Sequence, residues 1–234
     1  MLKYEEIAFE IRTLLDNGAY DAGERLPSIE HLKEKYHVSK STVIKALEIL
    51  EKEGYIYQSR GSGIFVRSRK REGYINLFTS NGFTDDLKKH HITSQVIEVK
   101  EMDNPEMTIK RHLHLNENDK VYAVKRIRYV DNEILCIEYA YFSQKVVPYM
   151  SEEIAKGSIF KYIEGNLKIN IGYSDIYFHI DALNEEEAKW LKQSMGAPTL
   201  RYEQVFYTKT GLPFDYSQIV FHKENAKFYI PSIK

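Results

Sequence analysis

The chain has 234 residues, with 33 Lys and Arg against 34 Asp and Glu, so its net charge is −1 and it is not a uniformly basic nucleic-acid-binding protein. Its apolar runs are shorter than the roughly 20 residues of a membrane span, and acids occupy positions 5 and 6, where a signal peptide would be apolar. We therefore expect a cytoplasmic protein with no membrane partner. The single cysteine, Cys136, lies in the apolar run 134–137, which predicts a buried core residue and no disulfides.

The N-terminal part of the chain shows the apolar periodicity of three helices. Apolar residues with helical spacing predict a first helix over 4–15, which ends near Gly18. Ser28 and Ser39 are residue types that cap helix N-termini, and they predict a short second helix and a third helix that stops at Gly54.

A β-hairpin is predicted directly after the third helix. The strand-like segments 55–59 and 64–67 flank the turn 60–63, which contains two glycines. Three helices followed by such a hairpin predict a winged helix-turn-helix. The stretch 57–71 contains basic residues and no acid, and its end, 67–72, is charged without an apolar period, which predicts an exposed linker. The predicted organisation is a winged helix-turn-helix over 1–68, a linker over 69–74 and a second domain over 75–234.

The remainder of the chain alternates long strands with short helices, which predicts an α+β domain around a mixed, mainly antiparallel sheet. Strands are expected at 95–101, 120–130, 134–142, 173–181, 200–208 and 214–222, and helices at 84–90, 105–113, 158–166 and 184–194, the last with Asn184 as its N-cap.

The N-terminal motifs resemble those of the GntR family of bacterial transcriptional regulators. Four motifs in the family's order carry this resemblance: 18–28 (GAYDAGERLPS), 38–43 (VSKSTV), 46–51 (ALEILE) and 61–66 (GSGIFV). The resemblance implies that the third helix enters the major groove of operator DNA and that the wing contacts the backbone or minor groove. An isolated helix with this pattern would more often be a solvated surface. The residues expected to contact DNA are Ser28, Ser39, Lys40, Ser41, Thr42, Ile44, Lys45, Arg60, Gly61 and Gly63.

The chain departs from the family pattern at several of these positions. Ile29 and Glu30 stand where an acid and an arginine are usual, and Lys40 and Ile44 replace two arginines of the recognition helix. A bidentate contact to guanine is therefore not expected, and Ile44 is a candidate for contact with thymine methyl groups, which predicts an A/T-leaning operator. Gly63 is expected to let the wing backbone approach a minor groove closely.

The second domain resembles the UTRA effector-binding domain of the HutC subfamily, which shares the chorismate lyase fold. The motifs are 83–86 (FTDD), 124–131 (VKRIRYVD), 137–142 (IEYAYF), 158–160 (SIF) and 211–217 (GLPFDYS). The resemblance implies that an arginine pair holds the anionic end of an effector, with the other residues around it. The expected effector-binding residues are Phe83, Thr84, Arg126, Arg128, Glu138, Ser158, Phe160, Asp215 and Tyr216.

The arginine pair leaves more than one interpretation open from the residues alone. Arg126 and Arg128 are two apart on a predicted strand and share one face, where they need an anion or carboxylates between them. A surface ladder of ion pairs is the plainer interpretation. If the arginine pair binds an anion and nearby carboxylates accept hydrogen bonds from hydroxyl groups of the ligand, the implied ligand is a sugar phosphate. A carboxylate or an amino-acid derivative is the alternative, and an enzyme with a chorismate lyase-like domain is a further one.

Other chemistry has weaker support in the sequence. His90 and His91 are adjacent, and His112 and His114 point to different faces, so neither pair has the spacing of helical metal ligands. We expect no metal, no cofactor and no catalytic residue. A homodimer on an inverted repeat is expected, because each half-site needs one recognition helix. The overall prediction is an allosteric regulator, and a repressor in particular.

Overall fold

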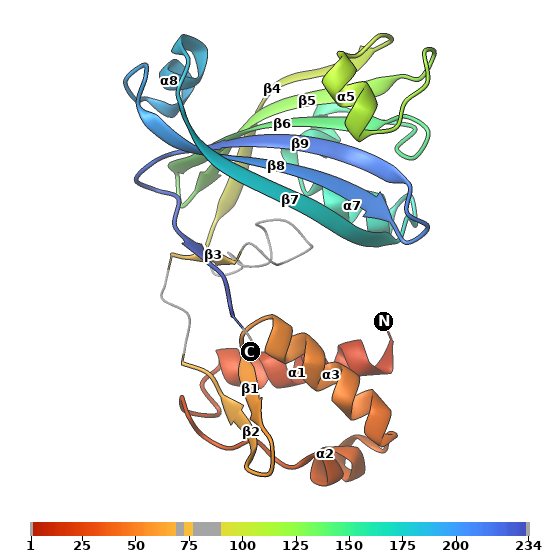
Figure 1. The fold of residues 1–234 in the computed structure, drawn as a ribbon, viewed down its shortest axis with the longest axis vertical. Helices are drawn as coiled ribbons and strands as arrows, with labels where there is room; N and C mark the ends of the chain where they lie inside the picture. Colours follow the sequence, from red (N-terminus) through yellow and green to blue (C-terminus); the bar gives the residue numbers. More distant parts are fainter. Residues whose placement is uncertain (1, 69–72, 77–89, 233–234) are drawn as a thin grey trace. The chain divides into compact units, whose positions relative to one another are not determined.

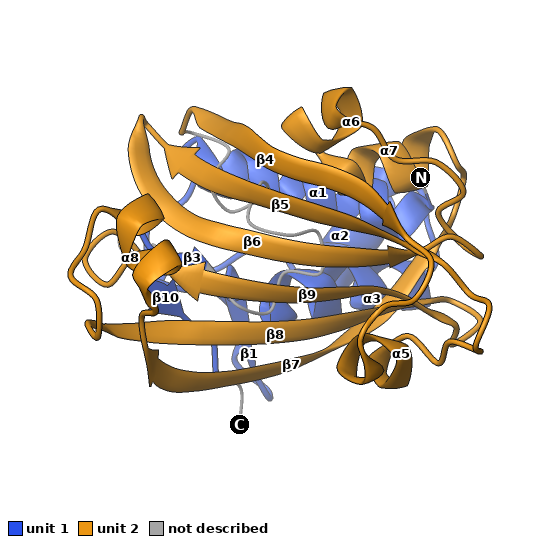
Figure 2. Cartoon of the chain, turned by 90° about the horizontal axis from the view of Figure 1, so that it is seen from above, with its two compact units in different colours: residues 1–78, 228–234 blue, residues 79–227 orange. Residues whose placement is uncertain are grey.

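The computed structural model describes residues 2–68, 73–76 and 90–232, and the chain divides into two compact units. Unit 1 comprises residues 1–78 together with the C-terminal segment 228–234, and unit 2 comprises residues 79–227 (Figure 2). The predicted helix 84–90, and with it Phe83 and Thr84, lies outside the described residues except for its last position.

Unit 1 contains the predicted winged helix-turn-helix (Figure 1). Its elements are α1 (Lys3–Asp16), α2 (Ile29–Tyr36), α3 (Lys40–Lys52), β1 (Ile56–Ser59) and β2 (Gly63–Val66). The apolar stripes of the three helices meet in one core, in which Val43, Ala46, Leu47 and Leu50 of α3 are fully buried. The three helices and the hairpin thus confirm the arrangement expected from the sequence.

The C-terminal segment also belongs to unit 1, which the sequence did not suggest. Strand β10 (Phe228–Tyr229) pairs in parallel with β3 (Ile75–Asn76). Farther along, Pro231 approaches Gly54 so closely that a β-carbon on Gly54 would lie 2.7 Å from the Pro231 Cβ, and Arg67 Nη1 donates to the Ser232 carbonyl over 3.4 Å. The last residues therefore pack on the helical head, whereas the predicted organisation placed them in the second domain.

Unit 2 is built on a six-stranded antiparallel sheet in the order β4-β5-β6-β9-β8-β7. All six predicted strands are present: β4 (Ile92–Met102), β5 (Val121–Val130), β6 (Glu133–Ser143), β7 (Ile171–Ala182), β8 (Pro198–Thr208) and β9 (Pro213–Phe221). Four of them are longer than expected, whereas β5 is one residue shorter and β9 is shifted by one residue. Tight turns with positive φ at Asp131, Asn132 and Gly211 join neighbouring strands. The antiparallel, α+β character predicted from the sequence is thereby confirmed.

Short helices cover both faces of this sheet. Helices α6 (Glu152–Lys156) and α7 (Ile159–Gly165) pack on one face, around Phe142 and Phe206, and we call it the α7 face. Helices α5 (Met107–His112) and α8 (Glu185–Leu191) pack on the other, the α8 face. Helix α6 was not predicted, and the other three are shorter than their predicted spans. None of the helices in the described ranges is long and apolar enough to cross a membrane.

Candidate functional site

The N-terminus of α3 presents a cluster of hydroxyl groups and a cation. Ser39 Oγ accepts a hydrogen bond from the Thr42 amide over 3.3 Å and lies 2.9 Å from both Ser41 Oγ and Thr42 Oγ1. Beside it, the exposed Lys40 Nζ lies 3.9 Å from Glu30 Oε1. Helix N-termini attract anions, so this cluster is suited to a phosphate or a base edge.

The outward face of α3 continues with Ile44 and Lys45. Lys45 is exposed, and its Nζ lies 5.8 Å from the centre of the Tyr4 ring. Ile44 is half-buried, and it is absent from the set of residues that pack on the core of unit 1. The Ile44 side chain is therefore only partly exposed at the helix surface, whereas the apolar stripe of the helix had predicted that it faces outward. Ser28 is the predicted N-cap of α2 and accepts from the His31 amide over 3.2 Å.

The wing shows a feature that the sequence analysis missed. Gly63 has φ +126°, and a β-carbon there would lie 2.6 Å from Arg25 Nε. The space beside Gly63 is therefore occupied by the Arg25 side chain, whereas the sequence had suggested that this glycine makes room for DNA. Arg60 and Gly61 are exposed at the tip. Arg25 adds a cation next to the wing, and its place in the motif 18–28 was the available signal.

In unit 2, Arg126 and Arg128 lie on the α7 face of β5 and are both buried, with 3% and 8% of their surface exposed. Arg126 forms a bidentate pair with Glu138 of β6, with Nε to Oε2 at 3.0 Å and Nη2 to Oε1 at 2.9 Å. Its Nη1 donates to the carbonyl oxygens of Ala155 (2.7 Å) and Gly157 (3.1 Å) beside α6. Arg128 Nη1 donates to Glu138 Oε2 over 3.2 Å. This buried arrangement excludes the surface ladder of ion pairs.

The two guanidinium groups are not equally satisfied. Among the residues that the structure describes, Arg128 Nε is buried and has no hydrogen-bond partner. Burial and the neighbouring Arg126 charge lower the pKa of Arg128. For Glu138, burial alone would raise the pKa, but Arg126 and Arg128 together outweigh it and hold this pKa below its ordinary value. One carboxylate thus serves two cations, which leaves an excess positive charge at Arg128.

Asp215 lies on the same face of the sheet, on β9. Burial raises the pKa of Asp215 to about 8, the nearby Glu138 carboxylate adds to this, and the hydrogen bond of 2.7 Å from Ser217 Oγ opposes it. At neutral pH this carboxyl group is therefore mostly protonated and can both donate and accept hydrogen bonds.

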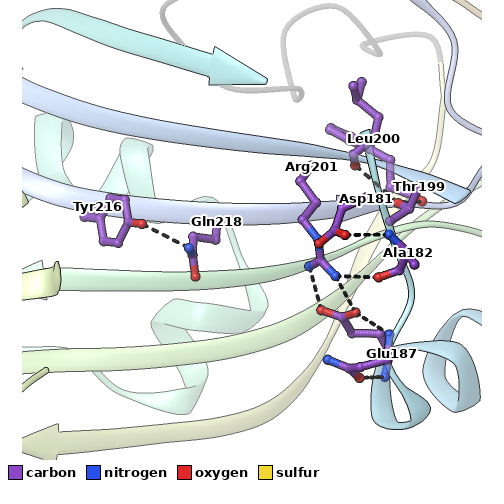
Figure 3. A network of polar contacts seen from close by, with 10 residues as sticks. Asp181, Ala182, Glu187, Thr199, Leu200, Arg201, Tyr216 and Gln218 are labelled. Atoms are coloured by element: carbon purple, nitrogen blue, oxygen red, sulfur yellow. Dashed lines mark hydrogen bonds and ion pairs between the residues drawn. The ribbon is translucent and has the colours of Figure 1, made fainter. Parts of the chain in front are cut away.

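Tyr216, which the sequence placed in the same site, lies on the opposite face of β9. Side chains alternate along a strand, so Tyr216 points to the α8 face, where it stacks on His112 and receives a hydrogen bond from Gln218 (Figure 3). The prediction that Tyr216 lines a pocket together with Asp215 is wrong for this reason.

Ser158 and Phe160 lie near the arginine pair but have local roles. Ser158 Oγ caps α7 by accepting from the Lys161 amide over 3.3 Å. Phe160 is half-buried and packs on Phe206, with ring centres 4.6 Å apart. The turn before α7 is connected to the arginine pair through the Gly157 carbonyl, which brings Ser158 to the edge of the cluster.

Four polar residues on the α7 face, Ser174, Tyr202, Gln204 and Ser217, were not among the predicted site residues. Gln204 is buried, donates to Ser174 Oγ over 2.8 Å and accepts from the Tyr202 hydroxyl over 2.9 Å. It is paired across the ladder with Ser217, the partner of Asp215. Every second residue of β8 shares a face, and Gln204 stands between Tyr202 and Phe206 on that face, which was the available signal. The α7 face therefore carries neutral polar groups beside its charged cluster.

A second ion-pair network lies on the α8 face (Figure 3). Arg201 donates to both oxygens of Glu187 at 2.8 Å, to Asp181 at 2.8 Å and to the Ala182 carbonyl at 3.0 Å. Glu187 also forms the capping box of α8 with Asn184. These groups satisfy one another, so this network fixes α8 on the sheet. In the described part of the chain, no group of three or more His, Cys, Asp or Glu side chains is arranged to hold a metal ion.

Comparisons with known proteins agree with this architecture. The model of the bacterial regulatory proteins of the gntR family matches residues 3–66, and the UTRA domain model matches residues 88–227. The HTH-type transcriptional regulator YydK of Bacillus subtilis is 43% identical over 98% of this chain and 97% of its own length. Its crystal structure superposes with a TM-score of 0.85 over 100% of both chains, at 42% identity.

Two repressors are more distant relatives. The transcriptional repressor NagR of Bacillus subtilis is 27% identical over 96% of this chain and 92% of its own length. The mannosyl-D-glycerate transport/metabolism system repressor MngR of Escherichia coli is 26% identical over 96% and 93%. The chain therefore belongs to the GntR family of bacterial transcriptional regulators, in the HutC type that joins a helix-turn-helix head to a UTRA effector domain.

Proposed function

We propose that this protein is a repressor whose affinity for operator DNA is set by a small anionic metabolite. In this proposal a homodimer in the cytoplasm places two α3 helices in the half-sites of an inverted repeat. The metabolite is a phosphorylated sugar, and the protein has no enzymatic activity. The names of two relatives, NagR and MngR, support a repressor, and that of MngR supports a carbohydrate effector.

The observation that carries the effector class is the excess positive charge at the arginine pair. Among the described residues, Arg126 and Arg128 face one ionised carboxylate, Glu138, while Asp215 is mostly protonated at neutral pH. A buried cation with an unpaired N–H is costly unless an anion binds it. A phosphate or carboxylate near Arg128 Nε would supply that partner through a charge-assisted hydrogen bond.

The neutral polar groups around the cluster favour a ligand with hydroxyl groups. Asp215, Ser217 and Gln204 lie side by side on neighbouring strands, and each can donate and accept hydrogen bonds. A sugar presents the same mixture of donors and acceptors. A simple carboxylate would use the arginine pair but leave these groups with less to bind.

The DNA-binding part of the proposal is tested with two lysines of the same helix. Lys40 lies at the N-terminus of α3 and Lys52 at its C-terminus, and both are exposed. We expect Lys40→Ala to weaken binding to the upstream operator fragment in a mobility-shift assay, and Lys52→Ala to leave it nearly unchanged. Equal effects of the two substitutions would show that the N-terminus of α3 does not contact DNA.

The effector is tested by thermal denaturation of the full chain with a panel of probes. Hexose 6-phosphates should raise the melting temperature, because a ligand that binds only the folded state stabilises it by mass action, and Arg128→Ala should abolish the shift. Lys125→Ala is the matched control, since Lys125 directly precedes Arg126 on the same strand but points to the α8 face. Stabilisation by citrate or free amino acids but not by hexose phosphates would replace the sugar phosphate with a carboxylate ligand.

A further inference from the structure

Strand β7 forms one border of the six-stranded sheet, and in the described part of the chain no strand pairs with its outer edge (Figure 2). Several of its large side chains are exposed: Tyr173, Tyr177, Phe178 and Ile180, the last with 70% of its surface. A long edge strand of this kind presents unpaired backbone N–H and C=O groups beside apolar side chains. It is a template for pairing with another strand.

The opposite border, β4, is protected in a way that β7 is not. Strand β4 has a bulge between Val96 and Glu98, carries the charged residues Lys100 and Glu101, and packs against α6. These are the devices that prevent edge-to-edge pairing. The central part of β7, residues 174–182, has no bulge, proline, glycine or lysine. In the part of the sheet that the structure describes, β7 is therefore the border that is open to a partner strand.

We propose that β7 pairs antiparallel with β7 of a second copy of this chain, with Tyr177 opposite Tyr177 at the two-fold axis. This proposal rests on the homodimer of the proposed function and supplies its interface. In this register Asp175 of each copy faces His179 of the other, so a carboxylate meets an imidazole N–H twice. The apolar pair Ile176 and Phe178 also face each other across the axis.

Other registers fit the strand less well. Because cross-strand neighbours share a face, a symmetric pair must be centred on one residue, and centring on Phe178 places Asp175 opposite Asp181, two like charges. Centring on Ile176 places Ile180 opposite Gly172. The register at Tyr177 keeps nearly the whole strand paired. Such an isologous contact uses the open border of both copies and leaves only protected borders, so assembly stops at two.

The test is a cysteine at the two-fold axis. The two copies of residue 177 would have Cβ atoms about 4.5–5.5 Å apart, close to disulfide geometry, so Tyr177→Cys should give a disulfide-linked dimer under mild oxidation. Tyr173→Cys is the matched control on the same face, because its two copies would lie about 27 Å apart. The native Cys136 is buried and unreactive in comparison.

A charge exchange tests the register independently. Asp175→Lys should weaken the dimer at least tenfold in sedimentation equilibrium, and adding His179→Asp should restore most of the loss. The two substitutions exchange the signs across the axis. Asp175 also accepts a hydrogen bond from Tyr207 within its own chain. Both variants carry Asp175→Lys and lose this hydrogen bond equally, so it does not affect the comparison between them.

The outcomes separate this interface from the proposed function. Cross-linking of residue 177 but not of residue 173, together with restoration by the charge exchange, supports the β7 interface. A wild-type dimer in which residue 177 cross-links no faster than residue 173 overturns the interface and leaves the dimeric regulator standing. A wild-type protein that is monomeric both free and on its operator overturns the interface and the homodimer together.

Discussion

Asp215 is a buried carboxyl group whose ionisation opposes folding. Burial raises its pKa to about 8 in the folded protein, against roughly 4 in an unfolded chain. Between these values the unfolded chain loses a proton that the folded protein keeps. The stability contributed by this group is therefore fully present below about pH 4 and falls as the pH rises towards 8, on the order of 1 kcal/mol per pH unit.

Asp215→Asn should remove this pH dependence, because the amide has a similar shape and does not ionise. Urea denaturation of both proteins at pH 5 and pH 7.5 measures the effect. Wild type should lose stability relative to the variant between the two pH values. If the difference between the two proteins is the same at both, Asp215 is ionised in the folded protein.

Within the described part of the chain, Glu138 is the carboxylate that pairs with both buried guanidinium groups, so we expect that a ligand anion can replace its charge. Glu138→Gln should cost about 3–5 kcal/mol without ligand, because Arg126 and Arg128 lose their counterion. Inorganic phosphate should then raise the melting temperature of the variant more than that of wild type, since it takes the place of the carboxylate.

The matched control for this substitution is Glu187→Gln, which removes a buried partner of Arg201 on the other face. It should destabilise the protein without increasing its response to phosphate, because Asp181 still faces Arg201. Melting curves in phosphate and in chloride of equal ionic strength provide the comparison. A phosphate response equal to that of wild type in Glu138→Gln would argue against an anion site at the arginine pair.

At the scale of elements, the C-terminal segment is fastened to the end of α3 through Gly54. Gly54 has φ +79°, and a β-carbon there would meet Pro231 at 2.7 Å, whereas Gly23 has φ +82° and open space around the same position. Both Gly→Ala substitutions impose a left-handed backbone on alanine, at a cost of about 1–2 kcal/mol.

Gly54→Ala should cost roughly 1–3 kcal/mol more than Gly23→Ala, because the chain around Pro231 must also move. Denaturant titration of the two variants and wild type measures the difference. Equal losses would mean that the C-terminal segment is not held against α3 in solution.

At the scale of the whole molecule, the proposed function requires the effector domain to change the affinity of the head for DNA. Arg128→Ala should leave operator binding without ligand nearly intact, because the head is unchanged, and should remove the response to the sugar phosphate. A charge-assisted contact contributes on the order of 2–3 kcal/mol, so ligand affinity should fall roughly 30- to 150-fold. Calorimetry and operator titration, each with and without ligand, measure both effects. An unchanged ligand response in the variant would place the effector elsewhere.

Much of this protein follows from local patterns in its sequence. The apolar stripes of α1 and α3, the serine caps at Ser28 and Ser39, and the alternating strands β4 to β9 are properties of neighbouring residues. They were therefore predictable, and so was the shared face of Arg126 and Arg128, which the period of a strand sets. The same local patterns predicted the order of these elements in two domains, and the family resemblance supplied their expected roles.

Other features depend on residues far apart in the chain, and only the tertiary structure decided them. The period of the predicted strand 214–222 already places Tyr216 and Asp215 on opposite faces, but only the tertiary structure shows that Asp215 is the one that shares a face with the arginine pair. The charge balance of the arginine pair depends on Glu138 and on carbonyl groups beside α6, a helix too short to predict from periodicity. The packing of Pro231 on Gly54 brings the C-terminal segment into contact with the N-terminal helical head. The sequence by itself determined the elements and which neighbouring side chains share a face, and the tertiary structure decided which elements pack together, because contacts between distant residues leave no local period.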